Sequence, residues 1–364
     1  MQSAWATDML PPHKQPKGGG ACASALSCHL NGVCEANLCR CDAAWTGPLC
    51  GTLHLLPTAA GPHSGRAWPS APNTSSWGGN VLEVDGSFHL YVSEMGGRCG
   101  LASWQHNSFV RHATALKPDG PYSEGEIVMA AFSHNAQAIR DHAGMIAVFH
   151  VGSGNPSPKG FITNCTNGTT PLPTPSRQRQ STEQAGAHGG AVARAPYSVP
   201  TSRSPGGPWT LTNLSCTGGP CPGFSNPSPH LLLNGTALLA WRTGGGGEDR
   251  SKWGMSIARA PGLFGPYTLL CDTPPCTNWS HPTWVPPAGH NCEDPFLWSD
   301  SRGGLHVMNH CYNQGDEGGH AFSEDGVHWH LSDVAPWTDS IHHTDVRLRL
   351  TVTQTQCSLA VWLT

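Results

Sequence analysis

"CEDPFLWSDSRGGLHVMNHC" (Cys292–Cys311) contains two short apolar runs, one on each side of a polar turn with two glycines. Runs of this length flanking a glycine-containing turn predict a β-hairpin. If the turn is centred between Ser301 and Arg302, residues equally far from that centre face each other across the two strands. The expected facing pairs are Trp298 with Leu305, Asp294 with Asn309, Glu293 with His310, and Cys292 with Cys311, the last within disulfide reach.

The same double run occurs three more times, and Asp-Gly or Asn-Gly turns between short apolar runs are strong hairpin signals. Each unit closes on Gly-Pro and an aromatic residue, or on a variant of that motif. The units are "GGNVLEVDGSFHLYVSEM" closing at Pro118–Tyr122, "HNAQAIRDHAGMIAVFHV" closing at Gly206–Trp209, "SNPSPHLLLNGTALLAWRT" closing at Phe264–Tyr267, and "EDPFLWSDSRGGLHVMNHC" closing at Asp325–Trp329. Repeats of about 60 residues that each hold several short strands are typical of β-propeller blades.

The composition agrees with an all-β fold. Charged residues make up only 12% of the chain, whereas Gly (44) and Pro (32) are abundant, which argues against a helical bundle. The formal net charge of −4 gives no electrostatic reason to expect nucleic acid as a partner. The longest apolar runs are far shorter than the ~20 residues of a membrane-spanning helix.

Fifteen cysteines indicate an oxidising compartment. Six N-x-[ST] sequons agree, and we expect glycosylation at Asn73, Asn164, Asn167, Asn213, Asn234 and Asn278. No apolar signal-peptide core is visible near the first residue, so either the start is missing or the export route is unusual. We expect an extracellular or cell-surface location.

Six of the cysteines are clustered near the N-terminus, in "CASALSCHLNGVCEANLCRCDAAWTGPLC". Their spacing, with Asn31-Gly32 before the third and Trp45-Thr46-Gly47 before the last, resembles an epidermal-growth-factor (EGF)-like module. The resemblance implies the pairs Cys22–Cys34, Cys28–Cys39 and Cys41–Cys50. A module this small depends on its disulfides because its core is insufficient. It is a candidate site for a protein partner, and a zinc interpretation of the six thiols is the less favoured alternative.

The four repeats resemble the five-bladed propeller superfamily of glycoside hydrolases that contains arabinanases, xylosidases and invertase-like enzymes. The resemblance covers about residues 60 to 335 and implies an all-β, five-bladed β-propeller. A fifth blade is expected after Trp337, but the tail carries no blade pattern. Two alternatives stay open: residues 52–70 close the ring together with the tail, or the last blade is incomplete. The expected domains are a disordered leader (1–20), the EGF-like module (21–51), the propeller (52–338) with a disordered insertion (166–190), and an atypical tail (339–364).

Superposing the four repeats places Asn80, Asn135, Asn226 and Asp294 at one position, at the starts of the inner strands beside the propeller channel. The resemblance implies aspartates at this position in some blades of the catalytic members. Asn binds a sugar hydroxyl but cannot abstract a proton, so three of the four positions do not carry the expected acid-base function.

The acid pair within "CEDPFLW" is either catalytic or simply the polar start of a strand, and both interpretations stay open. The catalytic candidates are Glu293, Asp294 and Glu94, since two carboxylates about 5 to 10 Å apart suffice for glycoside chemistry. The candidate ligand-binding residues are Asn80, His134, Asn135, His150, Asn226, Arg242 and His310. The first functional hypothesis is a glycoside-hydrolase-like protein, and the second is a non-catalytic glycan-binding or matrix protein. We expect a polysaccharide or a glycoprotein glycan as ligand, and neither a cofactor nor a metal ion.

The remaining cysteines allow further pairs. We expect Cys216–Cys221 and Cys271–Cys276 to close short loops, and Cys99 to pair with Cys165 by elimination. Cys357 is then left over.

Overall fold

The computed structural model describes residues 17–55, 75–123, 125–152, 165, 197–243, 254–271, 279, 282–284, 291–312 and 316–337. Strands dominate these residues, and the helical segments are one-turn pieces: η2 (Ala25–Cys28), η3 (Leu101–Ser103) and α1 (Trp104–Asn107). None of the helices in the described ranges is long and apolar enough to cross a membrane. The expected all-β class is confirmed.

Four four-stranded antiparallel sheets form blades of the β-propeller type, and within each sheet every strand pairs with the next in sequence. Blade 1 contains β5 (Ser75–Val84), β6 (Ser87–Met95), β7 (Ser108–Ala115) and β8 (Glu126–Met129). Blade 2 contains β9 (His134–Arg140), β10 (Ile146–Val151), β11 (Ser198–Ser202) and β12 (Thr210–Asn213). Blade 3 contains β15 (Ser225–Leu231), β16 (Ala237–Thr243), β17 (Gly254–Ala260) and β18 (Thr268–Leu269). Blade 4 contains β19 (Asn291–Ser299), β20 (Leu305–Tyr312), β21 (Asp316–Ser323) and β22 (His330–Leu331).

The predicted Asp-Gly turn of blade 1 is a two-residue hairpin loop. Val84 pairs with Ser87, and the two turn residues Asp85 and Gly86 have φ of 52° and 78°. Two consecutive positive φ values match the twist of the flanking strands, which explains why this dipeptide marks the hairpin in the sequence.

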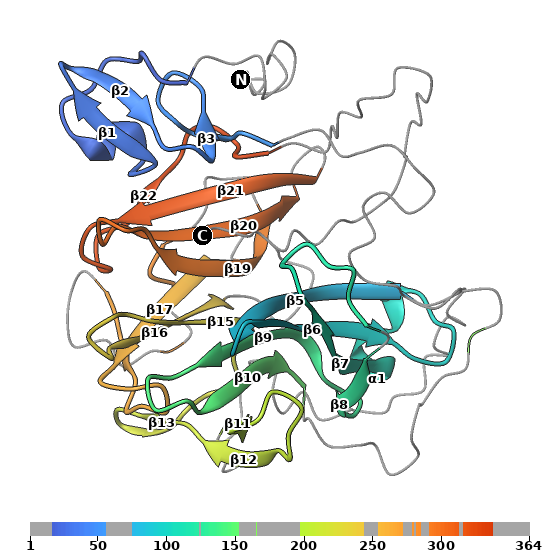
Figure 1. Ribbon diagram of the computed structural model, residues 1–364. Coiled ribbons are helices and arrows are strands. Elements are labelled where there is room, and N and C mark those ends of the chain that lie inside the picture. The colour runs from blue at the N-terminus through green and yellow to red at the C-terminus, as the bar shows by residue number, and fades with distance from the viewer. Residues whose placement is uncertain are drawn as a thin grey trace, which may run out of the picture. The chain divides into compact units, whose positions relative to one another are not determined.

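Blades 1, 2 and 3 lie in one compact unit and pack face to face. In Figure 1 their inner strands β5 and β9 run side by side. Tyr91 of β6 and Val148 of β10 share a buried cluster between blades 1 and 2, and Phe149 and Trp241 belong to a larger cluster between blades 2 and 3. Three aromatic residues that close the repeats also pack in these cores: Trp209 and Tyr267 join the clusters between blades, and Tyr122 joins a cluster within blade 1.

The second compact unit contains blade 4 and the N-terminal module. The module consists of η2, the hairpin of β1 (Gly32–Glu35) with β2 (Leu38–Cys41), and the pair of β3 (Trp45–Thr46) with β4 (Thr52–Leu53). Residues 18–20 are hydrogen-bonded to the module. Gly18, Gly19 and Gly20 donate backbone hydrogen bonds to Gly47, Cys39 and Pro48, respectively.

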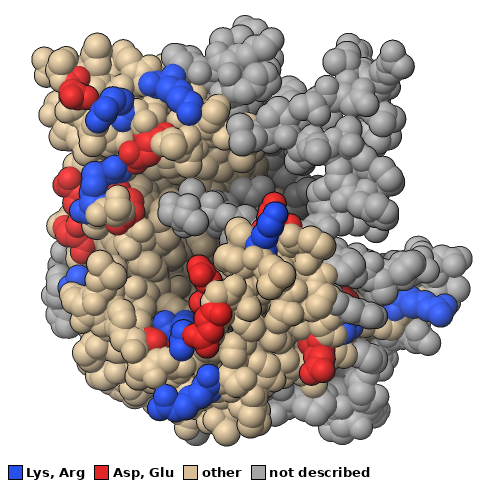
Figure 2. Space-filling view, in the orientation of Figure 1, with Lys and Arg blue, Asp and Glu red and all other residues tan. Residues whose placement is uncertain are grey.

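The structure therefore describes four blades, and the other expected segments lie outside the described residues. These are the first 16 residues of the leader, the insertion at 166–190, most of the stretch 52–70, and the tail 339–364 in which the fifth blade was sought. A further two-strand hairpin, β13 (Ser215–Cys216) with β14 (Gly219–Pro220), leads from blade 2 into blade 3. The face seen in Figure 2 carries few charged side chains, with acidic and basic groups interspersed, as the low charged fraction predicts.

Candidate functional site

The inner strand of every blade begins with the same backbone irregularity. Gly78, Asn135, Asn226 and Asp294 have φ of 59°, 56°, 52° and 53°, and each lies at a β-bulge between the inner strand and its neighbour. Gly, Asn and Asp are the residues that adopt this left-handed conformation at low cost. The residue types at the four strand starts are thus first of all what the bulge requires.

The bulge corrects one prediction from the sequence. Asn80 was superposed on Asn135, but the equivalent residue of blade 1 is Gly78, where an added side chain would collide with Asn135 Oδ1. Asn80 lies two residues further along β5. Its amide donates to the carbonyl oxygen of Ala138 (2.7 Å) and accepts from the Ala138 N–H (2.7 Å), which connects the inner strands of blades 1 and 2.

The register of blade 4 differs from the prediction on one side of its bulge. Cys292 pairs with Cys311 and Glu293 with His310, as expected, whereas Trp298 pairs with His306 rather than Leu305. Asp294 does not pair with Asn309 because it occupies the bulge. The turn is centred on Arg302, half a residue beyond the predicted centre, so the predicted pairs between the bulge and the turn are one position off. On the other side of the bulge, the extra residue cancels this error, and Glu293 and Cys292 have their predicted partners. One unpaired residue shifts a ladder by one position.

Glu94 is the catalytic candidate that the structure defines best. It lies near the end of β6 with 4% of its surface exposed, and both carboxylate oxygens accept hydrogen bonds from Arg111 of β7 (3.1 Å each). A bidentate pair of this kind holds the carboxylate in a fixed orientation. Arg111, which the sequence interpretation did not name, follows from the pairing of β6 with β7, a register that the sequence left undetermined.

His134 and Asn135 open β9 beside a short helical loop of blade 1. His134 Nδ1 lies 2.8 Å from Ser108 Oγ, which also donates to the carbonyl of Ser133 (2.8 Å). Ser108 therefore accepts the Nδ1 proton, which fixes the tautomer of His134. Trp104 of α1 packs against the His134 ring with centroids 5.1 Å apart and remains half-buried. Burial lowers the pKa of His134 to about 3, so the ring is neutral at physiological pH.

The loop that carries Trp104 is fastened at its base. The Cys99–Cys165 disulfide, predicted by elimination, joins it to the long connection between β10 and β11. Asn107 donates to the carbonyl of Gly96 (3.0 Å), and the Cys165 N–H donates to that of Gly97 (2.8 Å). Trp104 was not among the sequence candidates, because sequence alone does not show which aromatic residues remain accessible.

Two further predicted residues lie near the ends of second strands. His150 of β10 is buried, and burial lowers its pKa to about 4. Its Nδ1 lies 3.3 Å from the backbone oxygen of Val151. Arg242 of β16 is opposite Ser225 and donates to its hydroxyl at 2.9 Å. Their role in ligand binding stays a prediction.

Glu293, Asp294 and His310 belong to the other unit, at the start of β19 and on β20. Both acids are half-buried, and His310 is 9% exposed. The Cys292–Cys311 disulfide lies directly beside them. The acid pair therefore occupies a fixed backbone position at the bulge of blade 4.

The disulfide framework follows the sequence prediction wherever it is described. Cys22–Cys34, Cys28–Cys39, Cys41–Cys50, Cys99–Cys165, Cys216–Cys221 and Cys292–Cys311 are all bonded. Cys271 is also disulfide-bonded, while its expected partner Cys276 and the leftover Cys357 lie outside the described residues.

Residues 22–50 match the EGF-like domain family. No curated protein matches the whole chain significantly. Among solved structures, the chain is similar to the family 43 glycoside hydrolase BlXynB of Bacillus licheniformis (TM-score 0.45, 13% identity, 75% of this chain and 47% of that one). It is also similar to Zg3597, a family 117 glycoside hydrolase of Zobellia galactanivorans (TM-score 0.45, 14% identity, 72% and 70%). The chain spans about half the length of BlXynB. Likenesses this distant do not assign an activity.

The EGF-like module contains a cluster of sulfur atoms that resembles a metal site. Sulfurs of Cys22, Cys28 and Cys39 lie within 4.8 Å of one another. All three are in disulfides and offer no thiolate, which contradicts the zinc alternative for this module.

Two of the six sequons can be located. Asn213 on β12 and Asn234 in the turn between β15 and β16 are exposed, as a glycosylated side chain requires. The other four, Asn73, Asn164, Asn167 and Asn278, lie outside the described residues. Glycosylation stays a prediction at all six.

Proposed function

We propose that this protein is an extracellular carbohydrate-binding protein in which polar residues at the bulged starts of inner strands bind a glycan. The observation that carries the proposal is the repeated bulge: Asn135 and Asn226 occupy it in the unit of blades 1 to 3, and Asp294 occupies it in blade 4 of the other unit. An amide both donates to and accepts from a hydroxyl group, and a carboxylate accepts, so these groups suit a ligand rich in hydroxyls.

An aromatic residue near the start of β9 supports the same proposal. Trp104 is half-buried, and its ring packs against the ring of His134, one residue before Asn135. Small-ligand sites combine apolar or aromatic surface with a few well-placed polar groups. Trp104, packed on the residue before Asn135, supplies an aromatic group in the same unit as the amides Asn135 and Asn226. An extracellular location is supported by the EGF-like module and the disulfides.

Glycoside hydrolysis is the second candidate, and the adjacent acids Glu293 and Asp294 favour it. Hydrolysis of this type uses two carboxyl groups, one as an acid and one as a base or nucleophile. The third expected carboxylate, Glu94, has both oxygens bound to Arg111. Since two of the three non-glycine bulge residues are amides, binding without turnover is the function we favour.

A glycan array combined with a panel of chromogenic glycosides tests both candidates. We expect the wild-type chain to bind a glycan without turnover. Asp294→Asn and Glu293→Gln should weaken binding by about 1 to 3 kcal/mol, the cost of disturbing a buried hydrogen bond. Glu324→Gln is the matched control, because Glu324 is an exposed acid of the same blade.

The alternative outcomes are distinct. Turnover that falls by ~10² to 10⁴ in either acid variant while binding persists would establish the hydrolase instead. Trp104→Ala should weaken glycan binding, whereas Ala at the exposed neighbour Gln105 should not. If the wild-type chain neither binds nor cleaves any glycan, the proposed function is wrong.

A further inference from the structure

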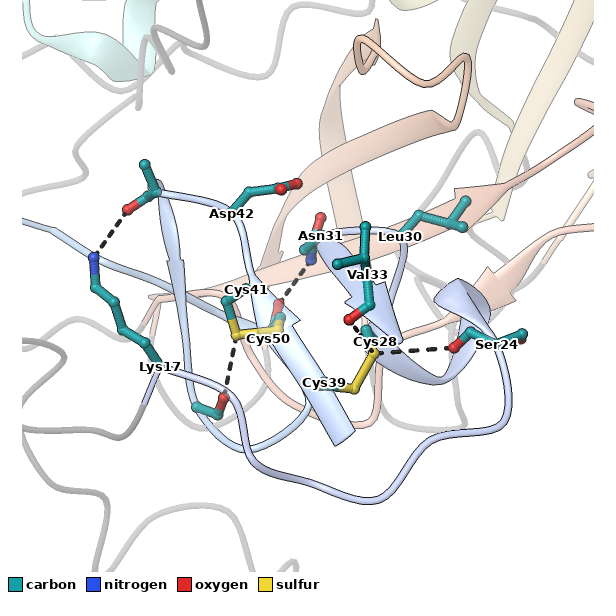
Figure 3. The surroundings of a disulfide bond; sticks show 12 residues. Lys17, Ser24, Cys28, Leu30, Asn31, Val33, Cys39, Cys41, Asp42 and Cys50 are labelled. Atoms are coloured by element: carbon teal, nitrogen blue, oxygen red, sulfur yellow. Dashed lines mark hydrogen bonds between the residues drawn. A yellow bond between two sulfur atoms is a disulfide. The ribbon is translucent and has the colours of Figure 1, made fainter. Parts of the chain in front are cut away.

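The EGF-like module is docked on blade 4 through the turn between β19 and β20. Arg302 of this turn donates to both carboxylate oxygens of Asp42 (3.0 and 2.6 Å) and to the carbonyl of Leu30 (2.7 Å). Figure 3 shows Asp42 and Leu30 on the module. The Leu53 N–H also donates to the carbonyl of Pro336 (2.9 Å). The module is therefore attached to the blade by side-chain and backbone hydrogen bonds.

Beside these bonds lies a stack of histidine and aromatic rings, which we call the histidine stack. It runs across blade 4 from Trp298 to His306 (centroids 4.8 Å apart) and on to His320 (5.3 Å). The module completes it, because Trp45 lies 5.1 Å from His320, and His29 lies 5.2 Å from Phe322 of the blade. The rings are buried on both sides of this contact. They are His29 and Trp45 of the module, and His306, His320 and Phe322 of β20 and β21.

The contact between His306 and His320 excludes protonation of both rings at once. His306 Nδ1 and His320 Nε2 are 3.1 Å apart, so one donates to the other, and two protonated rings could not share this contact. Within the described residues, His320 Nδ1 is buried without a hydrogen-bond partner. Protonating both nitrogens of His320 would therefore create a buried charge whose Nδ1–H has no acceptor, which is costly.

The charged groups around the stack are few. Asp300 Oδ2 lies 3.6 Å from His306 Nε2, and Asp333 Oδ1 lies 3.6 Å from His29 Nε2. His330 lies against Phe322, with centroids 5.6 Å apart. Burial would raise the pKa of Asp300, but contacts with His306 and with the backbone of the turn lower it overall.

Burial lowers the pKa of His29, although Asp333 partly opposes this. Burial, together with nearby His306 and His29, lowers that of His320 well below 6.5. The Asp42 hydrogen bonds raise the pKa of Arg302, which stays charged throughout.

We propose that the histidine stack makes docking of the EGF-like module sensitive to pH, so that acidification releases the module from blade 4. When the module is docked, His29 and His320 bind fewer protons than the same side chains in water. Docking is thus at full strength above about pH 6.5 and weakens as the pH falls below that value. A histidine that is neutral when docked has a pKa near 6.5 once the module is released. At pH 5, each such histidine shifts the docking equilibrium towards the released module by up to about 30-fold.

Residue-resolved hydrogen exchange of the full chain at pH 7.5 and pH 5 tests the proposal, with protection factors corrected for intrinsic exchange. The Leu53 amide reports on docking through its bond to Pro336, and the Asp42 amide, which donates to Asn31 inside the module, is the internal control. We expect Leu53 to lose protection about 30-fold or more at pH 5, while Asp42 keeps it. Equal protection of Leu53 at both pH values would overturn the proposal.

Variants identify the groups responsible. His320→Phe keeps an aromatic ring but binds no proton, so most of the pH dependence should disappear. His29→Gln alters only the module's side and should reduce it, which keeps the test available if His320→Phe does not fold. His328→Gln, in the adjacent turn and 71% exposed, should behave as wild type. Wild-type pH dependence in His29→Gln and in a folded His320→Phe would show that the stack is not the switch.

Discussion

The Glu94–Arg111 pair combines two charges in a chain that otherwise has few of them. Glu94 is almost fully buried, and the Arg111 side chain is 20% exposed. A buried ion pair adds little compared with apolar residues of the same size, but removing one partner leaves the other charge desolvated. The stability of blade 1 therefore depends on keeping both residues or losing both.

Arg111→Met should destabilise the protein by about 3 to 5 kcal/mol, because it leaves the Glu94 carboxylate buried and unpaired. Urea denaturation measures the loss. The control is Arg40→Met, which breaks the exposed Arg40–Glu35 pair (72% and 65% exposed) and should cost under about 1 kcal/mol. Equal effects of the two substitutions would contradict this account of Glu94.

The histidines show how a weakly charged chain uses imidazole as a buried polar group. His89 and His112 of blade 1 form a hydrogen-bonded, nearly parallel pair (2.9 Å, 6°), at strand positions equivalent to those of His306 and His320 in blade 4 (3.1 Å, 9°). Burial, with His89 nearby, lowers the pKa of His112 to about 4. Neutral imidazoles satisfy each other across adjacent strands, and this repeated pair accounts for part of the high histidine content.

At the scale of the element, the bulge at the start of each inner strand has a clear conformational requirement. Asn226 has φ of 52°, and this left-handed conformation destabilises an alanine by roughly 1 to 2 kcal/mol relative to a glycine. Asn226→Gly should therefore be more stable than Asn226→Ala by about 1 kcal/mol, as measured by thermal or urea unfolding. At Leu211, an exposed residue of the edge strand β12, the order should reverse because Ala is favoured in an ordinary strand. The same order at both positions would contradict the bulge requirement.

The bulge is also the feature of the inner strands that the sequence pattern could not predict. The Asp85–Gly86 turn and the cysteine spacing predict their structures because each is a local geometric requirement of a few residues. Side-chain alternation has a period of two, so it cannot reveal one extra residue, and both Asn80 and Trp298 were consequently misplaced by the sequence. The Glu94–Arg111 pair and the position of Trp104 were not predictable because they depend on the register and loop path of neighbouring strands.

At the scale of the whole molecule, segments far apart in the sequence pack together. The N-terminal module packs with the last described blade, and Arg302 reaches Asp42 across 260 residues of sequence. Contacts of such separation leave no periodic signal, so the sequence did not predict this docking. The docked module covers the rings of His320 and Phe322 and the turn of Arg302.

Removing residues 1–55 should therefore destabilise blade 4. Without Trp45 and His29, the buried rings of His320 and Phe322 become exposed to water, and fully exposing one large apolar side chain costs about 1.5 to 3 kcal/mol. Amides of β20 and β21 should exchange roughly 10- to 100-fold faster in the shortened chain, whereas those of β16 and β17 in the other unit should not change. Arg302→Gln in the full chain removes the ion pair but leaves the rings covered, and its effect should be smaller. If β20 and β21 exchange equally in the shortened and full chains, the module is a tethered arm and not part of the blade's packing.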